Sequence, residues 1–176
     1  MHTKHHDMDE RHLIDVITDS ETGLLSGIFF RLRMEEEFKK SWRFGWTATL
    51  LVIEADGLDV IEQEEGHAAM EAAVLDIAGE VLTASRDVDL SARLDAHRFA
   101  MLLPGTPAEG ARTMVQRVMT DVLEKVPSIR LSVGIAEAPQ DNLTQADEFL
   151  ARAEKGCEVA RGQGDNKVAT WDMPSA

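Results

Sequence analysis

The stretch from Arg86 to Pro104, RDVDLSARLDAHRFAMLLP, constrains the fold more than any other part of the sequence. Its second half is an apolar run that starts at Phe99 and stops at a Pro-Gly turn, a pattern typical of a buried strand. In its first half, apolar residues alternate with polar ones, which predicts a second strand. We therefore expect a hairpin whose tip displays four residues, Asp95, Ala96, His97 and Arg98.

Length and charge narrow the class of protein. The 176 residues suffice for one domain with a full core. A net charge of −14 argues against a DNA-binding surface, because such surfaces gain affinity by neutralising phosphates. No apolar run is long enough to span a bilayer, and the polar N-terminus has no signal-peptide core. The single cysteine, Cys157, lies on the apolar side of a predicted helix, so we expect a buried residue in a cytoplasmic protein.

Hydrophobic periodicity predicts an α+β fold with a central mixed five-stranded sheet flanked by helices. Residues 1–18 form an N-terminal arm that is partly disordered or a short helix, and its histidines are better explained by a tag-like start than by a metal site. The domain proper covers residues 19–172, and residues 173–176 form a tail. Ser26 is the expected N-cap of the first long helix. We expect long helices over 28–40, 68–85, 107–125 and 143–161, and strands over 47–54, 129–136 and 167–171 besides the two of the hairpin.

Six short motifs in this order resemble the GGDEF domain family, the diguanylate cyclases, over about residues 19–171. They are similar to the family's D-x-L-T-G-L, D-x-D, G-H, signature strand, S-x-G-x-A and A-K-x-x-G-x-N. In this chain they read Asp19-x-x-Thr22-Gly23-Leu24, Glu54-Ala55-Asp56, Gly66-His67, Phe99 with its strand, Ser132-Val133-Gly134-Ile135-Ala136 and Ala160-Arg161-x-x-Gly164-x-Asn166. The resemblance implies a palm-like fold. It also implies, for active members, that two subunits each hold one GTP and join the two into cyclic di-GMP.

Most positions that the family uses for this reaction differ here. The glycines of the signature align with Asp95 and Ala96, and its acids with His97 and Arg98. A carboxylate at Asp95 repels phosphate, and Mg²⁺ prefers oxygen ligands to an imidazole. The other aligned positions are Ser26 and Gly27 after the opening motif, Glu54 for the strand-end acid, Asp59 for a lysine, Glu62 and Glu71 for the two guanine readers, and Arg161 for the late lysine. We therefore expect neither cyclase activity nor Mg²⁺ binding, and we hypothesise that Arg98 lies near Glu54 and replaces the missing cation.

The family's product-inhibition site, an R-x-x-D ahead of the signature, is matched without change by Arg86 and Asp89. Arg117 stands about where a further arginine completes that site. Arginine presents a donor fork that fits O6 and N7 of guanine, and an aspartate can accept hydrogen bonds from guanine N1 and N2. The alternative is an ordinary surface ion pair, worth under ~1 kcal/mol.

These observations favour a catalytically inactive receptor for cyclic di-GMP that signals through another protein. A nucleotide-independent interaction scaffold ranks second, and a weak cyclase or GTP-binding domain ranks third. We expect an unidentified protein partner, because a domain of this kind without a fused output domain needs one to transmit a signal. The resemblance also favours a homodimer.

Overall fold

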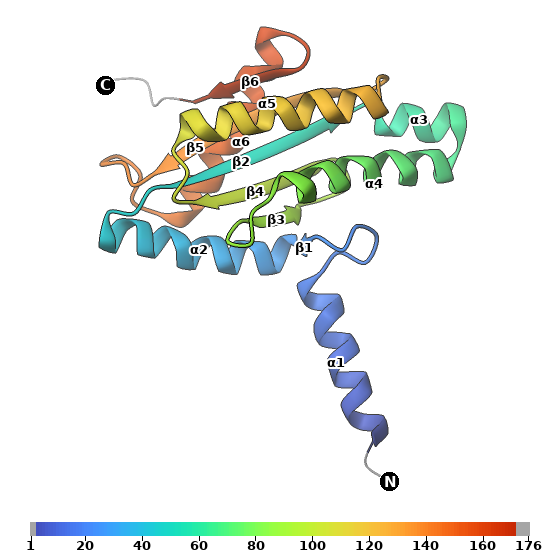
Figure 1. Ribbon diagram of the computed structural model, residues 1–176, viewed down its shortest axis with the longest axis horizontal. Coiled ribbons are helices and arrows are strands. Elements are labelled where there is room, and N and C mark those ends of the chain that lie inside the picture. Colours follow the sequence, from blue (N-terminus) through green and yellow to red (C-terminus); the bar gives the residue numbers. More distant parts are fainter. Residues whose placement is uncertain (1–2, 172–176) are drawn as a thin grey trace.

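The computed structural model describes residues 3–171, with side chains from residue 10 onward. Its centre is a six-stranded mixed sheet in the order β1-β3-β4-β2-β5-β6 (Figure 1). β2 pairs antiparallel with both β4 and β5, whereas the outer pairs β1–β3 and β5–β6 are parallel. The strands are β1 (Leu25–Ser26), β2 (Ala48–Asp56), β3 (Leu90–Arg93), β4 (Arg98–Pro104), β5 (Arg130–Ala138) and β6 (Lys167–Thr170).

Helices cover both faces of this sheet. The helices are α1 (Thr3–Ile17), α2 (Gly27–Phe44), α3 (Leu58–Glu65), α4 (His67–Ala84), α5 (Ala108–Lys125) and α6 (Ala146–Gln163). Side chains alternate between the faces along each strand, so Leu51 and Ile53 of β2 pack with the core under α3, α4 and α5. Leu50 and Val52 pack instead with the core under α2 and α6. α1 extends away from the sheet, from a point beside the start of α2 (Figure 1).

The contact between β5 and α6 is unusually close and needs two glycines. A Cβ atom built on Gly134 would lie 1.7 Å from the carbonyl oxygen of Ala153, and one on Gly156 would lie 2.8 Å from the Cα of Gly134. Because this approach fixes α6 against the sheet, it also fixes the side chains that α6 carries towards the end of β2. The glycine in the S-x-G-x-A motif is therefore required by packing.

The α+β architecture, the hairpin and the buried Cys157 are confirmed. Ser26 is the N-cap of α2, since its Oγ accepts a hydrogen bond from the backbone N–H of Phe29 at 3.2 Å. The strand count was wrong, because β1 has only two residues and pairs with β3, which no periodicity could reveal. The predicted elements include no helix over residues 58–65, but these residues form α3, whose buried residues are Leu58 and Ile61.

The arm that we expected to be partly disordered or a short helix is the 15-residue helix α1. The predicted tail at 173–176 lies outside the described residues. Within residues 3–171, no helix combines the length and the apolar character needed to cross a bilayer.

Candidate nucleotide sites at the hairpin tip and the Arg86 turn

The hairpin tip lies beside the end of β2, so the signature residues and the strand-end acids come together. Glu54 of β2 stands directly opposite Arg98 of β4 in the antiparallel register. Directly paired residues project from the same face of a sheet, here the face that α6 covers. The backbone of Ala55 also donates a hydrogen bond of 2.8 Å to the carbonyl oxygen of His97, which ties the tip to β2.

The carboxylate of Asp95 accepts hydrogen bonds from the N–H groups of the hairpin tip. Its Oδ1 accepts from the backbone N–H groups of His97 at 3.0 Å and Arg98 at 2.9 Å, while Oδ2 accepts from Nε of Arg98 at 2.7 Å. Successive N–H groups in a turn form a natural nest for an anion, and here the chain fills the nest with its own carboxylate. Burial by itself raises the pKa of Asp95, but the hydrogen bonds from Arg98 and from the N–H of His97 outweigh burial and hold that pKa below its ordinary value.

Two arginines neutralise the acids at this end of the sheet. Arg98 bridges Asp95 and, through Nη1 at 2.9 Å, Glu154 of α6. Arg161 of α6 forms an ion pair with Glu54, and its Nε lies 3.7 Å from Asp56. The hypothesis of a cation near Glu54 was therefore right about the face but wrong about the partner. Arg98 bonds Asp95 and Glu154, and Arg161 is the cation that Glu54 contacts.

The residues present do not fit a magnesium ion. Mg²⁺ needs carboxylate oxygens that are open to it, but Glu54 is held by a guanidinium, and an imidazole and a guanidinium stand at the two signature acids. Within the described part of the chain, no group of three His, Cys, Asp or Glu side chains could hold a metal ion.

The positions aligned with the guanine readers form a separate cluster on α3 and α4. Nδ1 of His67 lies 2.7 Å from Glu62, and its Nε2 lies 3.0 Å from Glu71. The hydrogen bond with Glu62, followed by the charge of Glu71, raises the pKa of His67. Asp59 is exposed in the first turn of α3. Each carboxylate at a position aligned with a guanine reader is thus paired with the imidazole of His67.

A cavity of about 660 Å³ opens between the hairpin tip and the α1–β1 connection. Ala96 lines it together with four carboxylates and a single guanidinium, those of Asp15, Asp19, Glu21, Asp95 and Arg93. Arg93 is nearly buried and bonds Glu21 at 2.5 Å, with Asp19 at 3.5 Å. The excess of negative charge makes this cavity unfavourable for a triphosphate.

The Arg86 turn is preorganised around the carboxylate of Asp89. This carboxylate accepts hydrogen bonds from the backbone N–H and from Nε and Nη2 of Arg86, at 2.8, 3.3 and 3.0 Å. Nη2 of Arg86 also donates to the carbonyl of Pro104 and to Oγ1 of Thr106. The side chain of Asp89 is 0% exposed and that of Arg86 is 55% exposed. In this geometry Asp89 orients the guanidinium, whose Nη1 remains available to a ligand, and a direct contact of Asp89 with guanine stays a prediction.

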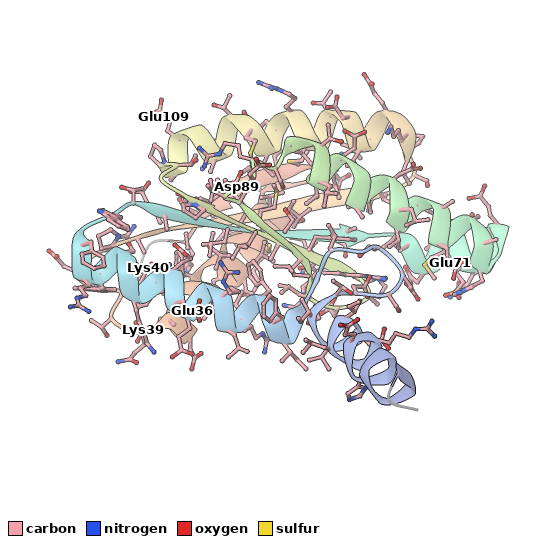
Figure 2. All side chains as sticks on the ribbon, turned by 60° about the horizontal axis from the view of Figure 1, so that its bottom comes forward. Glu36, Lys39, Lys40, Glu71, Asp89 and Glu109 are labelled. Atoms are coloured by element: carbon pink, nitrogen blue, oxygen red, sulfur yellow. The ribbon has the colours of Figure 1, made fainter. Side chains whose placement is uncertain are left out.

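The two arginines expected to bind the ligand lie at different distances along the axis of α5. Arg86 is anchored just before α5 begins, whereas Arg117 is exposed nine residues into that helix, about 14 Å along its axis. A cavity of about 350 Å³ borders Arg86 and Asp89, between the end of α4 and β1, and Arg117 does not line it. Figure 2 shows Asp89 and Glu71 well apart, so the Arg86 turn is separate from the positions aligned with the guanine readers.

The sequence analysis missed three residues that form ion pairs at these sites. They are Glu154, Arg93 and His67, the last of which lies between Glu62 and Glu71. Glu154 precedes Arg161 by seven residues, two helical turns, so the pattern of α6 could have placed both on one face. The spacing of His67 and Glu71, four residues apart at the start of a helix, likewise indicated a contact. Nothing local pointed from Arg93 to Asp19 and Glu21, which lie far away in the sequence.

The sheet order, the hairpin beside a strand end and the helices on both faces define an α+β domain of the palm-like type. The family model for the diguanylate cyclase GGDEF domain matches residues 16–167, and the chain belongs to this family.

Named relatives and solved structures agree with this assignment. The chain is 27% identical over 155 residues to the probable diguanylate cyclase DgcC of Escherichia coli K12, covering 85% of this chain and 42% of that protein. It is 30% identical over 151 residues to the diguanylate cyclase DgcP of Pseudomonas aeruginosa, covering 79% and 22%. The chain thus spans less than half the length of these relatives.

Among solved structures, the coiled coil and GGDEF domain of DgcB from Caulobacter crescentus, in complex with c-di-GMP, has a TM-score of 0.86 at 19% identity, covering 94% of this chain and 91% of that one. The diguanylate cyclase SiaD of Pseudomonas aeruginosa, in complex with its activator SiaC, has a TM-score of 0.79 at 25% identity, covering 93% and 65%.

Proposed function

We propose that this GGDEF domain is a non-catalytic receptor for cyclic di-GMP, which binds at Arg86 and Arg117 and signals by contact with another protein. Asp89 is part of the site and orients Arg86. A stacked pair of nucleotides spans the distance between the two arginines better than a single guanine does. A homodimer is compatible with this mode, because a stacked pair offers two faces.

We infer the absence of catalysis chiefly from one observation. The carboxylate of Asp95 accepts hydrogen bonds from the backbone N–H groups of His97 and Arg98 at the hairpin tip. Catalysis of phosphoryl transfer depends on positioning and on neutralising developing negative charge. Here a carboxylate fills the nest where an anion would sit, and Arg161 holds the strand-end acid Glu54. The charge of the neighbouring cavity opposes a triphosphate as well.

Ligand binding is supported by the state of the Arg86 turn. The guanidinium is held by four acceptor contacts through Nε and Nη2 and presents its remaining edge to solvent. Preorganisation of this kind lowers the entropic cost of binding a planar acceptor. GGDEF structures of the same fold have been solved with c-di-GMP, and SiaD with a protein activator, so this nucleotide and a protein partner are the first candidates.

Calorimetry tests the proposal with cyclic di-GMP on the wild type, Arg86→Ala and Arg117→Ala, with GTP plus Mg²⁺ as the parallel ligand. We expect cyclic di-GMP to bind and each variant to weaken it about tenfold or more, since the loss of a charge-assisted contact costs about 1.5–3 kcal/mol. Arg31→Ala, an exposed arginine of α2, is the matched control and should bind as the wild type does.

Each other outcome has a definite meaning. Arg86→Ala leaves the buried Asp89 carboxylate with only the backbone donor of residue 86, so its melting curve must be recorded. Arg117→Ala removes only an exposed side chain. The binding test therefore remains valid with this variant even if Arg86→Ala lowers the stability of the domain. Binding of neither nucleotide would leave a protein-interaction scaffold. Binding of GTP with chromatographic detection of cyclic di-GMP as a product would refute the non-catalytic assignment.

A further inference from the structure

A buried polar residue of the sheet, Thr49 of β2, belongs to neither of the two candidate sites. Its side chain is 0% exposed and lies on the same face of β2 as Leu51 and Ile53, under α3, α4 and α5. A hydroxyl buried in such a core costs free energy unless it finds a partner. Its Oγ1 donates a hydrogen bond of 2.6 Å to the carbonyl oxygen of Thr106, which follows 57 residues later in the chain. The partner therefore lies in the turn between β4 and α5.

This turn is held against the start of β2 at two successive residues. Gly105 has a φ of 77°, a conformation that favours glycine, and its N–H donates a hydrogen bond of 2.7 Å to the carbonyl oxygen of Thr47. The bond from Thr49 to Thr106 is the second contact. The sheet therefore fixes the backbone of Thr106, and with it the direction in which the Thr106 side chain leaves the turn.

The side chain of Thr106 contacts the arginine of the Arg86 turn. Its Oγ1 accepts a hydrogen bond of 2.9 Å from Nη2 of Arg86, and the carbonyl oxygen of Pro104 accepts from the same nitrogen at 3.0 Å. The carboxylate of Asp89 bonds the guanidinium along one edge only, through Nε and Nη2. A contact along one edge leaves the planar group free to tilt about that edge. The two acceptors from the β4–α5 turn restrict this tilt.

We propose that Thr106 is a positioning residue of the proposed nucleotide site, and that Thr49 acts through it. Thr106 stands two residues before α5, the helix that carries Arg117. Its hydrogen bond therefore sets Arg86 relative to the helix that carries the other arginine. A ligand that must reach both arginines binds more tightly when their separation is fixed beforehand, because ordering side chains on binding costs free energy. The inference rests on the proposed receptor function.

Calorimetry with cyclic di-GMP on the full chain tests the hydroxyl with two variants at one position. Thr106→Val keeps the branched shape but offers no acceptor to Arg86, whereas Thr106→Ser keeps the acceptor. We expect Thr106→Val to weaken binding about three- to tenfold, because Asp89 and Pro104 still hold the guanidinium, and Thr106→Ser to bind within about twofold of the wild type. Thr144→Val, at an exposed residue of the loop before α6, is the matched control and should leave the affinity unchanged.

The guanidinium of Arg86 reports its own positioning without any ligand. Hydrogen bonds through Nη2 slow the rotation of the group about the Nε–Cζ bond, and nitrogen-15 NMR measures this rotation in the free protein. We expect faster rotation in Thr106→Val and a rate close to that of the wild type in Thr106→Ser. Because Thr49 acts through Thr106, Thr49→Val should weaken cyclic di-GMP binding in the wild type and add no further loss in Thr106→Val.

The outcomes separate this inference from the receptor function. Wild-type affinity in Thr106→Val, or a loss in Thr106→Ser as large as that in Thr106→Val, would overturn the positioning role. A further loss from Thr49→Val in the Thr106→Val background would show that Thr49 does not act through Thr106. If the wild type binds no cyclic di-GMP, the receptor function fails, and the rotation rate of Arg86 still decides the positioning role: an unchanged rate in Thr106→Val would refute it.

Discussion

Replacing Asp95 measures how far the hairpin tip depends on its own carboxylate. The wild-type side chain accepts two backbone N–H groups and one guanidinium N–H. Asp95→Ala removes all three hydrogen bonds. Asp95→Asn keeps an acceptor for the two backbone groups and removes the charge that pairs with Arg98.

The magnitude follows from the exposure of the site. The side chain of Asp95 is 45% exposed and that of Arg98 is 31% exposed, so the ion pair itself is worth at most about 1 kcal/mol. Losing a side-chain acceptor for turn or helix-cap N–H groups costs about 1 kcal/mol. We expect Asp95→Ala to lower the free energy of unfolding by about 1.5 kcal/mol and the melting temperature by about 3–6 °C, and Asp95→Asn to lower them by less than half as much.

The pH dependence has a definite sign. The folded pKa of Asp95 is depressed, so its charge stabilises the fold fully above the pKa of the unfolded chain, and this stabilisation is lost as the pH falls through the folded value. Urea unfolding of both variants at neutral pH, followed by a titration towards acid, checks both expectations. If Asp95→Asn costs as much as Asp95→Ala, or if neither variant destabilises the domain, the tip does not depend on this carboxylate and the argument against phosphate binding there fails.

Three further predictions test the packing and the titrating groups. In urea unfolding, Gly134→Ala should destabilise the domain by about 3 kcal/mol or more, because its Cβ would collide with the backbone of α6. The control Gly79→Ala, which lies in open space on α4, should stabilise the domain by about 0.5–1 kcal/mol. Equal effects of the two substitutions would contradict the close contact between β5 and α6. Burial raises the pKa of Cys157 to about 12, so a thiol reagent at pH 8 should label it only in unfolded protein, and rapid labelling of the folded domain would disprove its burial. The pKa of His67 in a proton NMR titration should lie above 6.5 and should fall in Glu62→Gln. The stabilisation from its ion pairs with Glu62 and Glu71 is present below pH 6.5 and is lost as the pH rises through the pKa of the folded protein. A pKa at or below 6.5 in the wild type would exclude these ion pairs.

The sequence predicted the elements that carry strong local signals. The apolar runs of β2 and β4 are long enough to identify buried strands, and Ser26 is a typical N-cap before helical periodicity. β1 and α3 were missed because two residues carry no period, and because an acidic composition hides the few apolar positions of a short helix.

The sequence by itself determined the family, since six motifs in order suffice for that, and it predicted that His97 and Arg98 stand at the acid positions of the signature. Only the tertiary structure decided which side chains the residues at this end of the sheet contact. Arg98 pairs with Glu154, which is 56 residues away in the sequence, and Arg161 pairs with Glu54, which is 107 residues away. The burial of Asp89 beneath Arg86 is also a tertiary outcome, although the two residues are close in the sequence. Charge pairing depends on distances between side chains in space, and chain order fixes such distances only within a helix, a strand or a tight turn.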